Sequence, residues 1–338
     1  TTFYEFKHVE SKRPNVFRAN HYSIDSELSN HLSAVFNTVQ LPSRLNPKLP
    51  IMKFEDLPQL APQAVTGVIT PAVLNSYYNI TSNTGSELAS QAVFESLGQY
   101  YSPSDLTQFQ ETYDIPVQAI SEDIGGYSSD SECTADANNC AEANLDVQYL
   151  IAVSQGTPTI YWYEDATDSF LAWIQAVAAS DNPPLVNSIS YGSVETSLPS
   201  AIANAFNTEA LKLGTQGVSI LVSSGDDGVA NFQARTNPNK CGYNPSFPAT
   251  SQYVTAIGAT QGAESDTTEI ACSSRTGGVI TTGGGFSTIF SQPSWQSSAV
   301  ANYFAIATTP VSGYTSGRGY PDLSLAGTNY EVVIGGSI

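Results

Sequence analysis

The chain has 338 residues, which is long enough for one large α/β domain with an appended piece. It carries 12 Lys and Arg against 31 Asp and Glu, a formal net charge of −19, which argues against nucleic acid as a partner. Charged residues make up only 13% of the chain, so self-repulsion stays modest once acid protonates the carboxylates. No apolar stretch reaches membrane-spanning length, so we expect no membrane partner, and we expect a monomer.

The first 61 residues differ from the rest in charge. They have a net charge of +1, whereas residues 62–338 carry −20, and they hold all three histidines, His8, His21 and His31. Five prolines between positions 41 and 62 resist regular structure and predict a linker, with a new domain beginning near Val65. The arm would be held electrostatically at neutral pH and loosened in acid. A solvated arm without function is the alternative.

Strand-like and helix-like patterns alternate in the body. This alternation predicts right-handed βαβ crossovers and an α/β fold, with a parallel sheet, helices on both faces and an active site at the carboxyl ends of the strands. The predicted strands cover 117–121, 159–163, 185–190 and 219–223, and the predicted helices cover 141–154, 169–179 and 199–213.

Glu142 and Asp146 are four residues apart on a predicted helix, so they share one face, which Tyr149 and Val153 continue. Two neighbouring carboxylates in a partly desolvated cleft cannot easily both ionise, so one pKa rises and the pair can shuttle a proton. A solvated helix face is the ordinary alternative for an isolated acidic pair.

A second acidic group follows the apolar strand 219–223, in the sequence Ser224-Gly225-Asp226-Asp227-Gly228. A protonated Asp226 at this strand end could donate a hydrogen bond to a developing oxyanion in acid. The alternative is a turn with ordinary Asp and Gly chemistry, and we expect Asp227 to be the turn residue.

Two further segments have compositions that bear on ligand binding. Ser190, Tyr191 and Gly192 end another strand, and their backbone could pair with an extended peptide, although a buried strand end is equally ordinary. The glycine-rich segment 283–287 lacks the phosphate-loop pattern and a nearby lysine, so nucleotide binding has little support. A pepsin-like aspartic protease would require an all-β fold, which the α/β pattern does not offer.

The four cysteines lack C-x-x-C spacing, which argues against zinc. Sequence order suggests a Cys133–Cys140 loop and a Cys241–Cys272 bridge, although four cysteines permit three connectivities. Together with the glycosylation sequon at Asn79, they favour an oxidising, extracytoplasmic setting.

Ordered blocks across residues 65–335 resemble the sedolisins, the serine-carboxyl peptidases that include the tripeptidyl peptidases. The matching segments are 68–74, 98–101, 142–149, 190–192, 224–226, 247–249, 253–258, 283–287 and 319–322. The resemblance implies a subtilisin-like fold and hydrolysis of peptides or proteins by a Ser-Glu-Asp arrangement in acid. It implies that Glu142 is the general base toward a serine, that Asp146 supports it, and that Asp226 is the oxyanion donor. Ser190 to Gly192 would line the substrate cleft.

The resemblance also divides the chain. Residues 1–40 resemble the end of a propeptide, 41–64 would be the activation linker, and 65–338 would be a C-terminally incomplete peptidase domain. The family nucleophile lies in a Gly-Thr-Ser motif beyond the strand that ends here near Ser337, which lacks those neighbours. The family calcium site lies farther on, so no cofactor is expected in this chain and calcium is expected in the complete enzyme.

The chain as given is therefore expected to be inactive, to lack the last sheet strand and to leave apolar surface uncovered. We expect the complete enzyme to be secreted or to reside in an acidic vacuole or lysosome. A non-catalytic relative that binds peptides is the alternative.

Overall fold

The computed structural model describes residues 2–7, 15–29, 32, 35, 38–39, 67–166, 168–307 and 316–338, with only the backbone at position 236. The predicted activation linker, residues 41–64, lies outside the described residues. In the arm, strand β1 (Phe3–Phe6) pairs antiparallel with β2 (Val16–Ala19), and a short helix α1 (Ser26–Ser29) follows.

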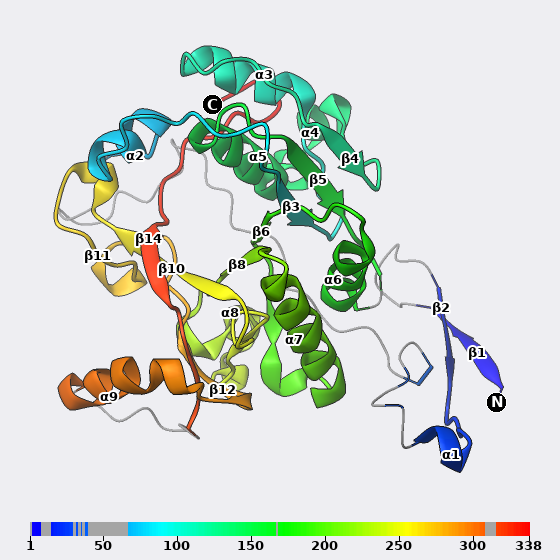
Figure 1. The fold of residues 1–338 in the computed structure, drawn as a ribbon. Helices are drawn as coiled ribbons and strands as arrows, with labels where there is room; N and C mark the ends of the chain where they lie inside the picture. Colours follow the sequence, from blue (N-terminus) through cyan, green and yellow to red (C-terminus); the bar gives the residue numbers. More distant parts are fainter. Residues whose placement is uncertain are drawn as a thin grey trace.

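Within the described residues, the centre of the body is an eight-stranded sheet with the order β11-β10-β8-β6-β3-β5-β4, and β14 also pairs with β10 (Figure 1). Every pairing is parallel except that of β11 with β10. The strands are β3 (Gln91–Glu95), β4 (Glu122–Ile124), β5 (Thr159–Tyr163), β6 (Val186–Ile189), β8 (Ser219–Ser223), β10 (Thr255–Gln261), β11 (Ile270–Ala271) and β14 (Leu323–Ala326).

Helices cover both faces of the sheet, as expected for parallel strands (Figure 1). Successive residues of β3 show this division, because Val93 packs with residues of α3 and α5 whereas Phe94 packs with residues of α6 and α7. The helices of the body are α2 (Pro71–Tyr77), α3 (Pro103–Thr112), α4 (Asp130–Ala135), α5 (Ala141–Val153), α6 (Ser169–Ala179), α7 (Ser200–Thr215), α8 (Gln233–Thr236) and α9 (Ser297–Ile306).

Helix starts follow from local sequence. The Thr70 hydroxyl accepts a hydrogen bond from the Val73 N–H at 3.3 Å, and Pro71 occupies the first turn of α2, where its missing N–H costs nothing. Ser102 and Pro103 start α3 in the same way, with the Ser102 hydroxyl accepting from the Asp105 N–H at 3.0 Å. Outside the main sheet, β7 (Ser193–Val194) pairs with β9 (Ser246–Phe247), and β12 (Gly285–Ser291) pairs with β13 (Gly317–Tyr320).

The predicted fold class is confirmed, and one predicted strand is wrong. Residues 117–121 contain no strand, and β4 lies just after them at Glu122–Ile124. Val117 is exposed, so its apolar character does not report burial in the sheet. The chain reaches the edge of β5 only at Ser121, whose N–H donates to the Thr159 carbonyl at 2.8 Å. The other predicted strands and helices lie within two residues of the observed ones.

The cysteine prediction is half confirmed. Cys133 and Cys140 form a disulfide with both residues buried, whereas Cys241 and Cys272 are free thiols. The Cys241–Cys272 bridge is therefore wrong: Cys241 lies on the surface, and Cys272 is buried with its sulfur against the Ile280 carbonyl. Sequence order alone could not reveal that the two side chains occupy such different surroundings.

Candidate active site

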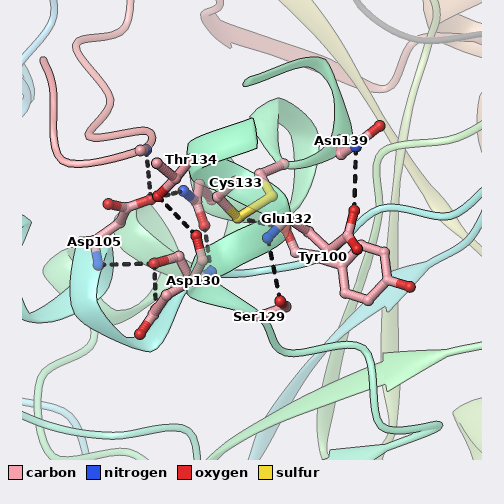
Figure 2. The surroundings of a disulfide bond; sticks show 12 residues. Tyr100, Asp105, Ser129, Asp130, Glu132, Cys133, Thr134 and Asn139 are labelled. Carbon is pink, nitrogen blue, oxygen red and sulfur yellow. Dashed lines mark hydrogen bonds between the residues drawn. A yellow bond between two sulfur atoms is a disulfide. The ribbon is translucent and has the colours of Figure 1, made fainter. Parts of the chain in front are cut away.

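Helix α5 begins directly after the disulfide, and its first turn carries Glu142. Figure 2 shows that the disulfide joins α4 to the residues that lead into α5, next to Tyr100 and Asn139. The Tyr100 N–H donates to the Asn139 carbonyl at 2.8 Å. The helix start is thus tied covalently to α4 and by a hydrogen bond to the segment that follows β3.

The side chain of Gln99 makes a second connection to the same turn. Its amide nitrogen donates to the Asn138 carbonyl at 2.9 Å, and its oxygen accepts from the Glu142 N–H at 3.2 Å. The Glu142 N–H is one of the donors that a helix start leaves without an intrahelical partner. Gln99 therefore fixes the backbone from which the Glu142 carboxylate projects.

Glu142 and Asp146 both line a cavity of about 480 Å³ at the carboxyl ends of the parallel strands. Ser190 follows β6, and its hydroxyl donates a 2.7 Å hydrogen bond to Asp146 Oδ2. The continuation of the predicted helix face is only partly correct, because Tyr149 is buried while Val153 is exposed. The acidic pair therefore lies in a partly enclosed cleft rather than on a solvated helix face.

The predicted binding strand borders the same cavity, which Ser190, Tyr191 and Gly192 help to line. The Tyr191 side chain is buried and lies edge-on to Phe94, with ring centroids 5.6 Å apart. A Cβ at Gly192 would lie 2.7 Å from Ser246 Oγ, so a larger residue would require the Ser246 side chain to move where this segment approaches β9. The backbone of the segment, rather than the Tyr191 ring, is what a ligand in the cavity would meet.

A third carboxylate, Glu95, was missed by the sequence interpretation. It is the last residue of β3 and is fully buried, and its Oε2 accepts a 2.6 Å hydrogen bond from the Tyr191 hydroxyl. The signal was present, because Glu95 ends an apolar run and the carboxyl ends of neighbouring parallel strands meet at one edge of the sheet. The interpretation did not recognise that run as the central strand.

The pKa values of all three carboxyls are raised. Burial raises the pKa of Glu142 well above its usual range, and the charges of Asp146, Glu95 and Asp226 raise it further. Burial also raises the pKa of Asp146 to about 7, although the hydrogen bond from the Ser190 hydroxyl and the neighbouring Glu95 carboxyl oppose the shift. The pKa of Glu95 is raised by burial and by Asp146. The cluster can therefore hold and exchange protons in mildly acidic solution.

Asp226 lies in the turn after β8 and lines the same cavity. The segment 281–283 supports this turn, since the Thr281 N–H donates to the Asp226 carbonyl at 2.8 Å and the Gly283 N–H donates to the Gly225 carbonyl at 2.6 Å. A Cβ at Gly283 would lie 1.9 Å from the Ser224 carbonyl oxygen. The glycine-rich segment thus serves close backbone packing beneath Asp226.

Arg235 is the other residue that the sequence interpretation missed. Its guanidinium contacts both acids of the turn, with Nε 2.7 Å from Asp227 Oδ1 and Nη2 3.2 Å from Asp226 Oδ2. Burial raises the pKa of Asp226, and the charge of Arg235 opposes this shift. Asp227, expected to be a turn residue, is thus also an ion-pair partner.

The structure describes no site for the calcium ion that the resemblance implies. Among the described residues, no group of three or more His, Cys, Asp or Glu side chains is placed to hold a metal ion. No step proposed below depends on such an ion. No helix in the described part of the chain is long and apolar enough to span a membrane.

A subtilisin-like parallel sheet with carboxylates gathered at the carboxyl ends of its strands defines a class of hydrolase fold. Among solved structures, Pseudomonas sedolisin (serine-carboxyl proteinase) complexed with two molecules of pseudo-iodotyrostatin matches with a TM-score of 0.57. The sequence identity is 24%, over 78% of this chain and 71% of that one, so this likeness supports the fold.

Sequence comparison supports the family. The chain is 31% identical over 340 residues to Tripeptidyl-peptidase 1 of Homo sapiens, and 33% identical over 279 residues to that of Canis lupus familiaris. These alignments cover 93% and 78% of this chain, but only 58% and 47% of the relatives. No family model matches the chain. The chain belongs to the sedolisin family of serine-carboxyl peptidases.

Proposed function

We propose that this chain supplies the acidic residues of an acid-active serine-type peptidase that hydrolyses peptide bonds in peptides or proteins. The observation that carries the proposal is that Glu142, Asp146 and Asp226 line one cavity together with the strand end at Ser190. The body offers no histidine to act as base, because all three histidines precede residue 32. Carboxyls with raised pKa values can exchange protons in acid, where histidine, with an ordinary pKa of about 6.5, is charged.

The proposed chemistry is acyl transfer. Glu142 takes the proton of a serine hydroxyl as its oxygen bonds to the scissile carbonyl carbon, and the carbonyl electron pair moves onto oxygen. A protonated Asp226 donates a hydrogen bond to that oxygen. Glu142 then gives the proton to the leaving amine as the C–N bond breaks and the carbonyl re-forms, which leaves the acyl group on the serine. A water that Glu142 deprotonates attacks this ester and releases the carboxylic acid, and the serine regains its proton from Glu142. Asp146 supports Glu142 throughout. The backbone at Ser190, Tyr191 and Gly192 pairs with the extended substrate.

The proposed mechanism also requires a serine nucleophile. The 338-residue sequence contains no Gly-Thr-Ser motif. Ser337 is exposed, and the neighbouring Gly336 carbonyl accepts from the Gln108 side chain of α3 at 3.3 Å, so Ser337 gains no support as the nucleophile. We propose that a serine outside this sequence completes the site and that the 338 residues alone do not hydrolyse peptides.

The remaining parts of the proposal follow the family resemblance. Residues 1–40 would be the tail of the enzyme's own propeptide, which would be released by cleavage in 41–64, and calcium would bind outside these residues. The Cys133–Cys140 disulfide and the exposed sequon residue Asn79 support an extracytoplasmic location, either secreted or in an acidic vacuole or lysosome.

The alternative is a non-catalytic relative that binds peptides in the same cavity. Peptide hydrolysis by the full-length gene product distinguishes the two functions. The peptidase proposal expects hydrolysis in acid that is lost in Glu142→Gln but kept in Glu87→Gln, which changes an exposed carboxylate in the same way. Peptide binding without hydrolysis by the full-length product would support the alternative.

A further inference from the structure

Arg235 holds two neighbouring carboxylates with one guanidinium. The Nε–Asp227 and Nη2–Asp226 distances are 2.7 and 3.2 Å, so the side chain bridges the two acids of a turn that lines the cavity. The guanidinium side chain is 29% exposed, whereas the Asp226 and Asp227 side chains are 15% and 17% exposed. The contact is therefore partly shielded from water, and its electrostatic effect is less screened than that of a fully exposed pair.

Cations are rare in the body of this protein, which makes the placement of Arg235 informative. Residues 62–338 contain five Lys and Arg. Lys212 pairs with Glu209 on the surface, and Arg318 pairs with Asp322. Among the ion pairs of the described residues, only those of Arg235 involve the carboxylates of the cavity.

The segment that carries Arg235 is held in place by side-chain amides. The Asn231 oxygen accepts from the Phe232 N–H at 2.8 Å, and the Asn231 amide nitrogen donates to the Asn244 carbonyl at 3.1 Å. The Asn244 amide in turn donates to the Ala230 carbonyl at 3.1 Å. These hydrogen bonds fix the backbone at the start of α8, the helix that carries Arg235.

The titratable groups that act on Asp226 oppose one another. Burial raises the pKa of Asp226, Arg235 of α8 lowers it, and Asp227 of the same turn raises it. The charge of Asp226 also raises the pKa values of two other groups, Glu142 of α5 and the buried thiol of Cys272. For Cys272, burial is the larger cause of the raised pKa. Arg235 is thus the cation that opposes the burial and the negative charge around Asp226.

We propose that Arg235 is a positioning residue that clamps Asp226 beside Asp227 and sets the pH at which Asp226 loses its proton. Given the proposed function, on which this rests, Arg235 then sets the alkaline limit of hydrolysis, because only protonated Asp226 can donate to the oxyanion. In acid the Asp226 carboxyl beside Arg235 is protonated and neutral, so it can donate a hydrogen bond to the oxyanion. Near neutral pH the positive charge of Arg235 stabilises the Asp226 carboxylate, which has no proton to donate to the oxyanion.

The first test is the titration of Asp226 itself in the full-length gene product. Infrared difference spectra against an Asp226→Asn variant report the Asp226 carboxyl, and the same difference is taken in the Arg235→Gln background. Loss of the cation should raise the titration midpoint by about one pH unit, the lower end of the usual effect of such a pair. Lys240→Gln is the matched control, since it removes an exposed positive charge from the segment after α8. Arg235→Lys should restore most of the wild-type midpoint.

The second readout is the pH profile of kcat/KM. Arg235→Gln should move the alkaline limb upward by the same amount, while Lys240→Gln leaves it in place. An Asp226 midpoint that is unchanged, lowered, or shifted equally in Lys240→Gln would overturn the proposal. Absence of hydrolysis in the wild type at any pH would instead overturn the proposed function, while the infrared titration would still decide what Arg235 does.

Discussion

The Tyr191 hydroxyl donates a 2.6 Å hydrogen bond to Glu95 Oε2, so a residue of the expected substrate-binding strand holds a carboxylate that the sequence interpretation missed. Both side chains are buried. The other carboxylate oxygen of Glu95 has no hydrogen-bond partner among the described residues. Because Asp146 and Glu95 act on each other's pKa, this contact connects the binding strand to the proton-holding cluster.

Replacing Glu95 with Gln should shift the acid limb of the pH profile. The Glu95 charge helps to raise the pKa of Glu142, so its removal should lower that pKa and extend activity to lower pH. Profiles of kcat/KM against pH for Glu95→Gln and for the exposed control Glu87→Gln measure the effect. An acid limb that stays in place or moves upward in Glu95→Gln would contradict the assigned coupling.

The largest loss of activity is predicted for replacement of Glu142 or Asp226. Glu142→Gln should lower kcat by about 10²- to 10⁴-fold, since general acid–base catalysis contributes that much. Asp226→Asn should lower it by about 10²- to 10³-fold, the usual cost of losing one oxyanion donor. Both replacements keep side-chain size, so thermal unfolding should change little. Asp181→Asn, which changes an exposed acid outside the cavity, is the control, and near-full activity of Glu142→Gln or Asp226→Asn would remove that residue from its role.

The raised pKa of Asp146 predicts that the protein loses stability as the pH rises. Asp146 titrates at about 7 in the folded protein, against about 3.9 in an unfolded chain. Between these values the native state binds the proton more tightly than the unfolded state, so the free energy of unfolding falls with rising pH. The scale is about 1.4 kcal/mol for each unit of pKa shift.

Chemical denaturation at several pH values between about 4 and 7 measures this loss. Asp146→Asn lacks the titrating group and should show a flatter dependence, whereas Asp181→Asn, which changes an exposed acid, should follow the wild type. Equal slopes for all three proteins would show that Asp146 is not the group responsible.

The Cys133–Cys140 disulfide should support both stability and activity. It closes a short loop, with a sequence separation of 7, so its removal by a Cys133→Ser, Cys140→Ser double replacement should cost roughly 2 kcal/mol. Because α5 begins at Ala141, a loosened helix start should also lower kcat more than it changes KM. Replacement of the free, exposed Cys241 by Ser is the control. A double variant with wild-type kcat would confine the disulfide to a stability role.

Much of the fold follows from local pattern. The strand at Thr159–Tyr163 and the helix at Ser169–Ala179 have the predicted bounds, because their apolar runs are continuous and bounded by polar residues. The strand expected at 117–121 was wrong because an apolar stretch beside a proline need not be buried. Central strand β3 was not predicted, although it is as long as β5 and β8, because it begins with Gln91 and ends with Glu95 and so contains only three apolar residues.

The candidate site was predictable where residues are close in sequence. Glu142 and Asp146 share a helix face by spacing alone, and Asp226 follows a recognisable strand. Glu95 and Arg235 act through contacts with residues from other elements of the fold, and no local pattern encodes such contacts. The mismatch between Cys241 and Cys272 has the same origin, because burial of one thiol and exposure of the other depend on tertiary packing.

The central claim is that these carboxylates serve a serine nucleophile in acid. It is tested by reading the gene beyond codon 338 and assaying its full product on a peptide substrate from about pH 3 to about pH 7. We expect a Gly-Thr-Ser motif and hydrolysis confined to the acid side of this range. A stop codon directly after Ile338, with no hydrolysis at any pH, would contradict the claim.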